Sequence, residues 1–478
     1  MPHVKKTPTR AAAKPEVASA PRPPSLVRRI WDSAVLRGPI VPQSDRDRAF
    51  VTVHTLLLHL RPVKVPARAI RFTHTFGLGG ASLVLLSLLG LTGLLLTLGY
   101  QPVPGTAYES VVGIERDVMF GTLVRGMHHW SANLLVLVMV AHAARVFLTG
   151  GYHGPRQFNW VVGVFLLLLV LVSAFTGYLL PWDQLSYWAV TISTGMLAYV
   201  PLAGESLQRV ARAGTDIGPR TLVVFYTLHT SIVPAILVFA LAFHFWRVRK
   251  AGGVIVPPPR DGEPVDDEKV MFLPHLLVRE VMLALVITAV VVVLAAAFGA
   301  PLGDRANPGM SPNPAKAPWY FMGLQELLVH LHPIAAVVIV PAVALLALVL
   351  LPYITSDDEP AGAWFLSPRA RQAALLAAII AASWTVVFIV PDAALSSRLP
   401  SFSGTTGFVA RGIVPLGIIA GVLVALARFV RRRHGLTPNE TVQAVVVFLF
   451  TAFVVVTMVG VWFRGPGMAL AWPWQGGH

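Results

Sequence analysis

The sequence predicts an all-α, polytopic membrane protein. Of its 478 residues, 55% are hydrophobic and 13% are charged, and the charged share is about half that of an average soluble domain. The apolar residues gather in long runs, and a membrane-spanning helix needs about 20 of them. The chain contains no cysteine, which excludes disulfides, covalently attached haem and Cys-ligated iron–sulfur clusters as chemistry of this chain. The composition and the long apolar runs exclude a soluble fold. Without cysteine, any metal must be held by His or carboxylate side chains.

The elements follow in order along the chain. Residues 1–49 are rich in Pro, Ala and Arg and contain no signal-peptide core, so we expect a disordered basic tail. A short amphipathic segment, 50–72, is expected on the membrane surface. Nine apolar runs then predict nine spans, at 75–99, 129–149, 158–180, 222–246, 276–299, 333–353, 372–391, 412–430 and 441–463. We divide the chain after the tail into domains 50–250, 251–392 and 393–478.

The net charge of +15 is distributed unevenly between the two sides of the predicted spans. If the N-terminus is cytoplasmic, 28 of the 38 Lys and Arg residues fall on that side and 10 on the other. Positive residues favour the cytoplasmic side of a membrane. We therefore expect a multi-pass protein of a bacterial inner (plasma) membrane, in contact with its lipids, with a cytoplasmic N-terminus and no nucleic-acid partner.

Four histidines occur in two matched pairs. His128 and His142 belong to the second span and His229 and His244 to the fourth. Each spacing returns to nearly the same helix face roughly 21 to 23 Å further along. A lone His in a span more often only hydrogen-bonds a neighbouring helix, but two matched pairs can clamp two flat cofactors. Because two neutral imidazoles fill both axial positions of a haem iron used for electron transfer, bis-His haem is the expected occupant.

Four glycines repeat the same spacing. Gly79 and Gly93 belong to the first span, and Gly163 and Gly177 belong to the third. Glycine in a membrane helix more often permits close helix packing, but these positions match the two histidine levels. The sequence thus predicts a four-helix bundle with two stacked, noncovalent b-type haems and about five further transmembrane helices.

At these residues the sequence resembles a known family, the cytochrome b subunit of quinol:cytochrome c oxidoreductases (bc and bf complexes). The resemblance rests on Arg-Gly-Met-His-His-Trp-Ser-Ala from Arg125, His-Ala-Ala-Arg-Val-Phe-Leu-Thr-Gly-Gly from His142, Gly-Tyr-Leu-Leu-Pro-Trp-Asp-Gln from Gly177, and Phe-Tyr-Thr-Leu-His-Thr from Phe225. The first 250 residues look most like the bf type. The next subunit would be fused on, followed by a C-terminal extension that we do not recognise.

The resemblance implies a ligand set. His128 and His229 would ligate the haem near the exoplasmic face, and His142 and His244 the haem near the cytoplasmic face. Arg125 matches the family arginine that pairs with a haem propionate. In the bf type an extra haem is attached through a cysteine, and Gly77 stands at that position here, so a third haem would have to be noncovalent.

Two quinone sites are also implied. Ala-Pro-Trp-Tyr-Phe, from Ala317, stands where the family has Pro-Glu-Trp-Tyr at its quinol oxidation site, so Pro318 replaces the glutamate and Tyr320 matches the tyrosine. We expect Glu326 as the substitute proton acceptor, while a mere loop-lining role for Glu326 stays open. On the opposite side Arg279 and Glu280 resemble the pair that serves quinone reduction, although a positive-inside helix start explains them almost as well. Arg249 matches a residue that borders the same site.

The expected function is quinol oxidation near the exoplasmic face, with electrons passing through the two haems to quinone at the cytoplasmic face in a proton-translocating Q cycle. Expected partners are the quinone pool, a Rieske iron–sulfur protein and/or c-type cytochrome subunits, in a dimeric complex. One alternative is a di-haem anchor that links quinone to a multihaem cytochrome or molybdoenzyme without a Q cycle. Another is a cofactor-free transporter, whose expected broken helices and midplane charges are not evident in the sequence.

Overall fold

The computed structural model describes residues 42–54, 62–259, 264, 268–357, 359, 361–395 and 404–474. It divides into two units, Met1–Val63 and Lys64–His478. In the first unit, helix α2 (Asp45–His54) begins inside the segment expected to be disordered. The reason is a reciprocal cap, in which the Asp47 amide donates to Ser44 Oγ and the Ser44 amide to the Asp47 carboxylate, each at 3.2 Å. Residues 1–41 of the predicted tail lie outside the described residues.

The second unit confirms the predicted all-α membrane fold. Its described residues contain nine helical segments long and apolar enough to cross a membrane. The first four are α4 (Leu78–Thr97), α6 (Gly121–Leu148), α7 (Gln157–Tyr178) preceded by the turn η1 (Gly154–Arg156), and α10 (Pro219–Thr227) continued by η3 (Leu228–Ile232) and α11 (Val233–Lys250). The helix of the second span starts at Gly121 rather than at residue 129, because it continues through the polar side chains, such as Arg125 and His128, that precede the apolar run.

The remaining five spans and the shorter elements complete this unit. The spans are α12 (Phe272–Phe298), η4 (Ile334–Ile339) with α14 (Val340–Ile354), α15 (Pro368–Leu395), α16 (Gly404–Phe408) with η5 (Val409–Ile413) and α17 (Val414–His434), and α18 (Pro438–Trp462). The shorter helices are α3 (Phe72–Thr75), α5 (Ala107–Asp117), α8 (Gln184–Gly195), η2 (Met196–Tyr199), α9 (Gly204–Arg212), α13 (Trp319–His330) and η6 (Pro466–Met468). Strands β1 (Lys64–Pro66) and β2 (Lys269–Met271) pair antiparallel, a contact too short to predict from sequence.

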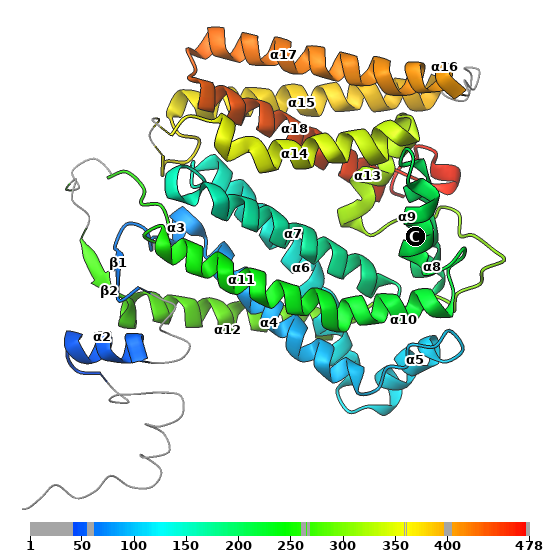
Figure 1. Cartoon of the computed structure of the whole chain (residues 1–478), viewed down its shortest axis with the longest axis horizontal. Helices are drawn as coiled ribbons and strands as arrows, with labels where there is room; N and C mark the ends of the chain where they lie inside the picture. The colour runs from blue at the N-terminus through cyan, green and yellow to red at the C-terminus, as the bar shows by residue number, and fades with distance from the viewer. Residues whose placement is uncertain are drawn as a thin grey trace, which may run out of the picture. The chain divides into compact units, whose positions relative to one another are not determined.

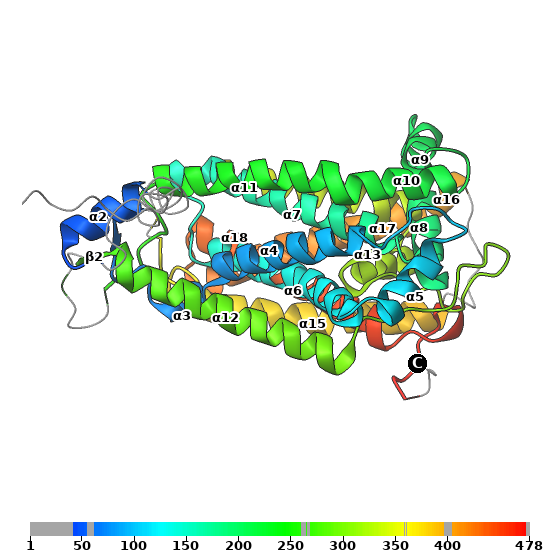
Figure 2. The same ribbon diagram turned by 90° about the horizontal axis from the view of Figure 1, so that it is seen from below.

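The long helices of this unit run side by side (Figures 1 and 2). The short helices α5, α8, α9 and α13 lie at one end, and β1, β2 and α3 lie at the other. We call these the α13 end and the β1 end. Many large apolar side chains remain exposed on the long helices, such as Val293 and Leu346, as expected for helices that face lipid.

The core of the four-helix domain lies between the two histidine levels. Buried side chains from four bundle helices and from α12 form one cluster, whose members include Leu85, Leu135, Leu166, Leu237 and Val291. The first four each fall, in sequence, between the two glycines or the two histidines of their own helix. Apolar packing therefore separates the two levels.

Three of the spans contain a wide, π-helical turn at the same sequence feature. The turns η3, η4 and η5 each end at the isoleucine of an Ile-Val-Pro triplet, whose prolines are Pro234, Pro341 and Pro415. Proline has no N–H and its ring collides with the carbonyl four residues earlier. An extra residue in the preceding turn relieves that collision without breaking the helix.

The C-terminal helices pack through small residues. Ala370, Ala373, Ala377 and Ala381 form one buried face of α15 against side chains from α17 and α18. Alanine at this spacing lets membrane helices approach closely. Helix α18 begins with a capping box, because the Thr437 side chain accepts from the Glu440 amide and the Glu440 carboxylate accepts from the Thr437 amide.

Candidate functional site

The first histidine pair lies towards the α13 end. His128 projects from α6 and His229 from η3, and their ring centres are 6.0 Å apart with the ring planes inclined at 73°. An imidazole nitrogen lies about 2 Å from the metal it binds, so two rings on opposite sides of one ion have centres roughly 6 Å apart. By this spacing, His128 and His229 would hold one haem between them.

Hydrogen bonds fix which nitrogen of each ring carries the proton. His128 Nδ1 lies 3.0 Å from Thr92 Oγ1, and that hydroxyl already donates to the Leu88 carbonyl, so it accepts from the ring. His229 Nδ1 donates to the Ser173 carbonyl at 2.9 Å. With Nδ1 carrying the proton, Nε2 of each ring keeps the lone pair that a metal requires.

Each of the four glycines lies against one of the four histidines. A Cβ atom added at Gly93 would lie 3.2 Å from His128 Cε1, and one at Gly177 would lie 2.4 Å from His229 Cε1. At the other level, a Cβ at Gly79 would lie 3.3 Å from His142 Cε1, and one at Gly163 would lie 3.6 Å from His244 Cε1. The structure thus brings His128 and His229 together and places one of the four glycines against each of the four histidines.

Arg125 lies at the α13 end of α6. Its guanidinium forms an ion pair with Glu115 of α5 and donates to the carbonyls of Ala300 and Pro301, at 2.9 and 2.6 Å. The side chain is largely buried, with 11% of its surface exposed. Arg125 is therefore held one turn from His128, where a guanidinium can meet the carboxylates of a bound haem.

The residues expected at the cytoplasmic quinone site lie towards the β1 end. Arg279 and Glu280 occupy the second turn of α12, and Arg279 donates to the Ile70 carbonyl, which precedes α3. Arg249 lies in the last turn of α11. The structure therefore places all three residues at the end of the unit opposite to α13.

Helix α13 connects the four-helix domain to the C-terminal helices. Trp319 and Tyr320, in its first turn, pack against the core of the four-helix domain, and Trp319 Nε1 donates to Asn133 Oδ1 of α6 at 2.7 Å. Burial raises the pKa of the Tyr320 phenol to about 12. Tyr320 is therefore a neutral hydroxyl at physiological pH, able to donate a hydrogen bond.

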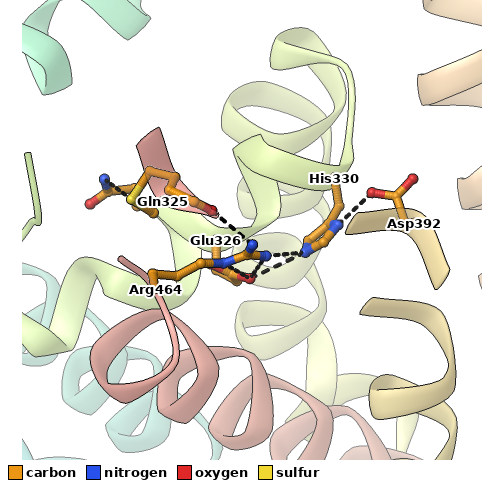
Figure 3. Close-up of polar contacts among 6 residues, drawn as sticks. Gln325, Glu326, His330, Asp392 and Arg464 are labelled. Carbon is orange, nitrogen blue, oxygen red and sulfur yellow. Dashed lines mark hydrogen bonds and ion pairs between the residues drawn. The ribbon is translucent and has the colours of Figure 1, made fainter. Parts of the chain in front are cut away.

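The far end of α13 carries a buried polar cluster (Figure 3). Glu326 is fully buried and forms an ion pair with Arg464, whose Nε lies 3.0 Å from each carboxylate oxygen. His330, one turn later on α13, has Nε2 at 3.2 Å from Glu326 Oε1 and at 3.0 Å from Arg464 Nη2. Its Nδ1 lies 2.7 Å from Asp392 Oδ2 on α15. We call Glu326, His330, Asp392 and Arg464 the α13 cluster.

The electrostatics of Glu326 follow from these contacts. Burial raises the pKa of the Glu326 carboxyl, but the hydrogen bonds and positive charge supplied by His330 and Arg464 outweigh burial and leave the pKa below its ordinary value. Glu326 is therefore ionised. Sequence reasoning missed Arg464 and Asp392, because partners 138 and 62 residues from α13 leave no local pattern; the Glu326–His330 spacing of four was the visible signal.

The chain is similar to known proteins both in sequence and in fold. A model of the family "Cytochrome b/b6/petB" matches residues 65–252. Cytochrome b6 of Porphyra purpurea is 44% identical over 175 residues, and cytochrome b6 of Acaryochloris marina is 41% identical over 175 residues; each match covers 37% of this chain and 81% of the relative.

A solved structure titled "Hyperthermophilic respiratory Complex III" matches the fold with a TM-score of 0.60 at 22% identity, over 84% of this chain and 93% of that chain. The fold likeness thus extends well beyond the region of sequence similarity. The family match, residues 65–252, includes the helices that carry all four histidines, and the cytochrome b6 matches cover most of each relative. The chain belongs to the cytochrome b/b6 family, and it is a multi-pass, haem-binding membrane cytochrome b of a quinol oxidoreductase.

Proposed function

We propose that this chain oxidises quinol near the exoplasmic face and returns electrons to quinone at the cytoplasmic face, so that a Q cycle translocates protons. The observation that carries the proposal is the pairing of His128 with His229 at one level, with a glycine packed against every proposed ligand at both levels. Two cofactor levels on the same four helices would supply a path for electrons along the membrane normal.

Four histidines would hold two noncovalent b-type haems, with His128 and His229 on one and His142 and His244 on the other. When bound, such haems supply one-electron carriers at two depths of the membrane. The chain's own contribution is positional. Nδ1 hydrogen bonds orient His128 and His229, and the glycines remove side chains that would occupy the cofactor levels.

The quinol oxidation site would lie beside the first turns of α13. Tyr320 is a neutral donor there, and Glu326 is the proposed proton acceptor in place of the residue that Pro318 replaces. The ionised state of Glu326 supports an accepting role. At the cytoplasmic side, Arg279 and Glu280 would supply charge and protons to quinone, and Arg249 would border that site.

The proposed partners are a Rieske iron–sulfur protein and/or a c-type cytochrome, because one of the two electrons of quinol must leave through a carrier outside this chain. The complex would be dimeric, in a bacterial inner membrane, with the N-terminus of this chain cytoplasmic. The excess of Lys and Arg on the proposed cytoplasmic side supports that orientation.

A second candidate function is a di-haem anchor that links quinone to a multihaem cytochrome or molybdoenzyme without a Q cycle. Pro318 in place of the expected glutamate and the C-terminal extension α17–α18 favour keeping this candidate. The two functions differ in what binds the chain and in whether an inhibitor of the exoplasmic quinol site abolishes haem reduction.

The test is to purify the complex, measure its haem content and reduced-minus-oxidised spectrum, and identify the copurified subunits. Two b-type haems per chain, reduction by quinol and a copurified Rieske protein are expected. His229→Leu and His244→Leu should each remove one haem and keep the other, which makes each variant the control for its partner. One haem or none in the unaltered chain would contradict the proposal, and a copurified molybdoenzyme would favour the anchor.

Glu326→Gln tests the proton acceptor separately. The amide keeps the shape of the side chain but cannot take up a proton, so quinol-driven haem reduction should slow by about a hundredfold while both haem spectra persist. Stopped-flow absorbance at the b-type bands measures the rate. Unchanged turnover would end the catalytic role of Glu326.

A further inference from the structure

The α13 cluster carries an inference about the extension that the family resemblance does not explain. We define the C-terminal segment as Arg464–Met468, which follows α18. Arg464 Nη1 donates to the Met468 carbonyl at 2.8 Å, while Nε and Nη2 face Glu326. The Gln325 side-chain amide of α13 lies 3.9 Å from Met468 Sδ. The C-terminal segment is thus folded onto α13 around the buried carboxylate (Figure 3).

Helix packing fixes this contact independently of the ion pair. A Cβ atom at Gly323 of α13 would lie 2.5 Å from Thr457 Oγ1 of α18, and one at Gly460 of α18 would lie 2.4 Å from Met322 Cγ of α13. Two glycines, one on each helix, therefore let α13 and α18 cross closely. Arg464 follows Gly460 by four residues, so the crossing positions its guanidinium beside Glu326.

His330 is the one side chain of the cluster that has partners for both of its protonation states. When neutral at Nε2, it accepts from Arg464 Nη2 at 3.0 Å; when protonated there, it donates to Glu326 Oε1 at 3.2 Å. Its other nitrogen, Nδ1, lies 2.7 Å from Asp392. A histidine with a satisfied partner in each state, and a different neighbour on each nitrogen, has the geometry of a proton carrier.

The exposure of the side chains increases along the α13 cluster. The Glu326 side chain has no exposed surface and that of His330 has 2%, while 28% of the Asp392 side chain is exposed. The charged groups that act on Glu326 are Arg464, from beyond α18, and His330, from its own helix. His332, on the following turn, packs against Phe408 instead. The hydrogen-bonded path therefore runs from a buried carboxylate to a partly exposed one.

We propose that His330 carries protons from Glu326 to Asp392, and that Arg464 is a positioning residue by which the C-terminal segment holds Glu326 and His330 in place. A proton that Glu326 accepts from quinol passes to His330 Nε2, and the proton on Nδ1 leaves to Asp392 and then to water. Exchange of the tautomer restores His330, and no electron moves in these steps. The relay rests on the proposed function, since it accepts the protons that quinol oxidation releases.

The test compares Asp392→Asn with Asp357→Asn in the purified complex. Asp357 is a matched control, because it pairs with His153 Nδ1 at 3.2 Å and is 46% exposed, but its carboxylate contacts Gly154 and Gln157 at the start of α7 and not α13. Decylubiquinol and menadiol serve as quinols, and haem reduction is followed across pH. We expect Asp392→Asn to slow haem reduction by about tenfold with unchanged haem spectra, and Asp357→Asn to match the unaltered complex.

Arg464→Gln adds a measurement that does not depend on turnover. Loss of the guanidinium should raise the pKa of Glu326, so the acidic limb of the pH profile should move to higher pH. Infrared spectra without quinol should show a protonated carboxyl at a pH where the unaltered complex shows none. The infrared band of this protonated carboxyl should vanish in the double variant Arg464→Gln with Glu326→Gln. Arg464→Lys, which keeps the positive charge, should partly restore the pH profile of the unaltered complex.

The outcomes separate the two proposals. An unaltered complex that quinol cannot reduce overturns the proposed function and the relay together. An active unaltered complex in which Asp392→Asn leaves the rate and pH profile unchanged overturns the relay alone, and reduces the α13 cluster to a clamp between helices. If Arg464→Gln does not accumulate in the membrane, Asp392→Asn, which changes a partly exposed side chain, still tests the relay.

Discussion

At the level of single residues, the candidate site depends on four glycines, whose lack of a side chain leaves room for the histidine rings. Gly177 lies so close to His229 that an added Cβ would approach the ring to 2.4 Å, closer than carbon atoms pack. The glycine therefore serves the histidine opposite it and not the flexibility of its own helix. The contact between glycine and histidine is visible in the sequence as the spacing of 14 residues between the two glycines of each helix.

Gly177→Ala should therefore displace the His229 ring and remove the haem proposed for the His128–His229 level, while the haem proposed for the other level stays. Gly90→Ala is the control, because no atom of the described residues lies within 4 Å of a Cβ at that position. Haem content and the b-type absorbance bands of the purified complex report the result. Full haem content in Gly177→Ala would show that the ring can move aside without losing its ligand role.

The His and Gly pairs differ from the partners of Glu326 in what the sequence records of them. The His and Gly pairs could be predicted because helical periodicity records which side chains share a face. The partners of Glu326 could not, because Arg464 and Asp392 come from helices whose packing is decided in three dimensions. A single arginine in an aromatic C-terminal stretch carries no signal of the carboxylate it will meet.

At the scale of elements, the wide turn η3 sets the direction of His229. The turn contains one more residue than an α-helical turn, and Pro234 follows it. Each residue turns an α-helix by about 100°, so closing the wide turn would rotate His229 relative to His244. The sequence periodicity assumed a regular helix here, so it predicted that His128 and His229 lie close together but not that His229 belongs to a wide turn.

Pro234→Ala should let η3 relax towards an α-helical turn and weaken haem binding at the His128–His229 level. Pro415→Ala is the matched control, because it follows the equivalent turn η5 in a span without proposed haem ligands. Redox titration of the two haems is the measurement. Equal potentials and haem content in both variants would mean that packing, not the proline, holds the turn.

Folding stability should depend on pH through His74 in the short helix α3, at the β1 end. His74 is buried, donates from Nε2 to the Ile255 carbonyl at 2.8 Å, and its own carbonyl accepts from Arg145. Burial, followed by the charge of Arg145, lowers the pKa of His74 from 6.5 to about 4. The unfolded chain therefore binds a proton in this range that the folded chain does not, and stability falls as pH falls from about 6.5 to about 4.

His74→Gln should reduce that loss, since glutamine can keep the hydrogen bond to Ile255 and does not titrate. The melting temperature of the detergent-solubilised protein, measured across this pH range, checks it. His275→Gln, at an exposed position on α12, is the control and should follow the unaltered protein. An equal decline in all three proteins would assign the acid sensitivity to other groups.

At the scale of the whole molecule, the nine predicted spans are all present among the described residues. Hydropathy and length were sufficient for them, because the bilayer imposes one simple constraint on every span. The positions of α13 and the C-terminal segment were not predictable in the same way. These elements do not span the membrane, and their places follow from contacts between helices distant in sequence.

The orientation of the molecule has a direct test, because the chain contains no cysteine. Thr215→Cys, before α10, and Arg433→Cys, in the last turn of α17, place single thiols at exposed positions on opposite ends of the long helices. A membrane-impermeant maleimide should label Thr215→Cys in intact cells and Arg433→Cys only after the membrane is opened. The reverse labelling pattern would place the N-terminus outside the cytoplasm.

The ion pair between Glu326 and Arg464 has a consequence for biogenesis. The two residues are 138 positions apart, and a ribosome that adds about 5–20 residues per second needs roughly 7 to 28 seconds to add that many residues. Throughout that interval the nascent chain carries a carboxylate without its guanidinium, a state that is costly in an apolar surrounding. A stalled or truncated translation product would keep this defect permanently, and membrane proteases that survey unfinished proteins could recognise it.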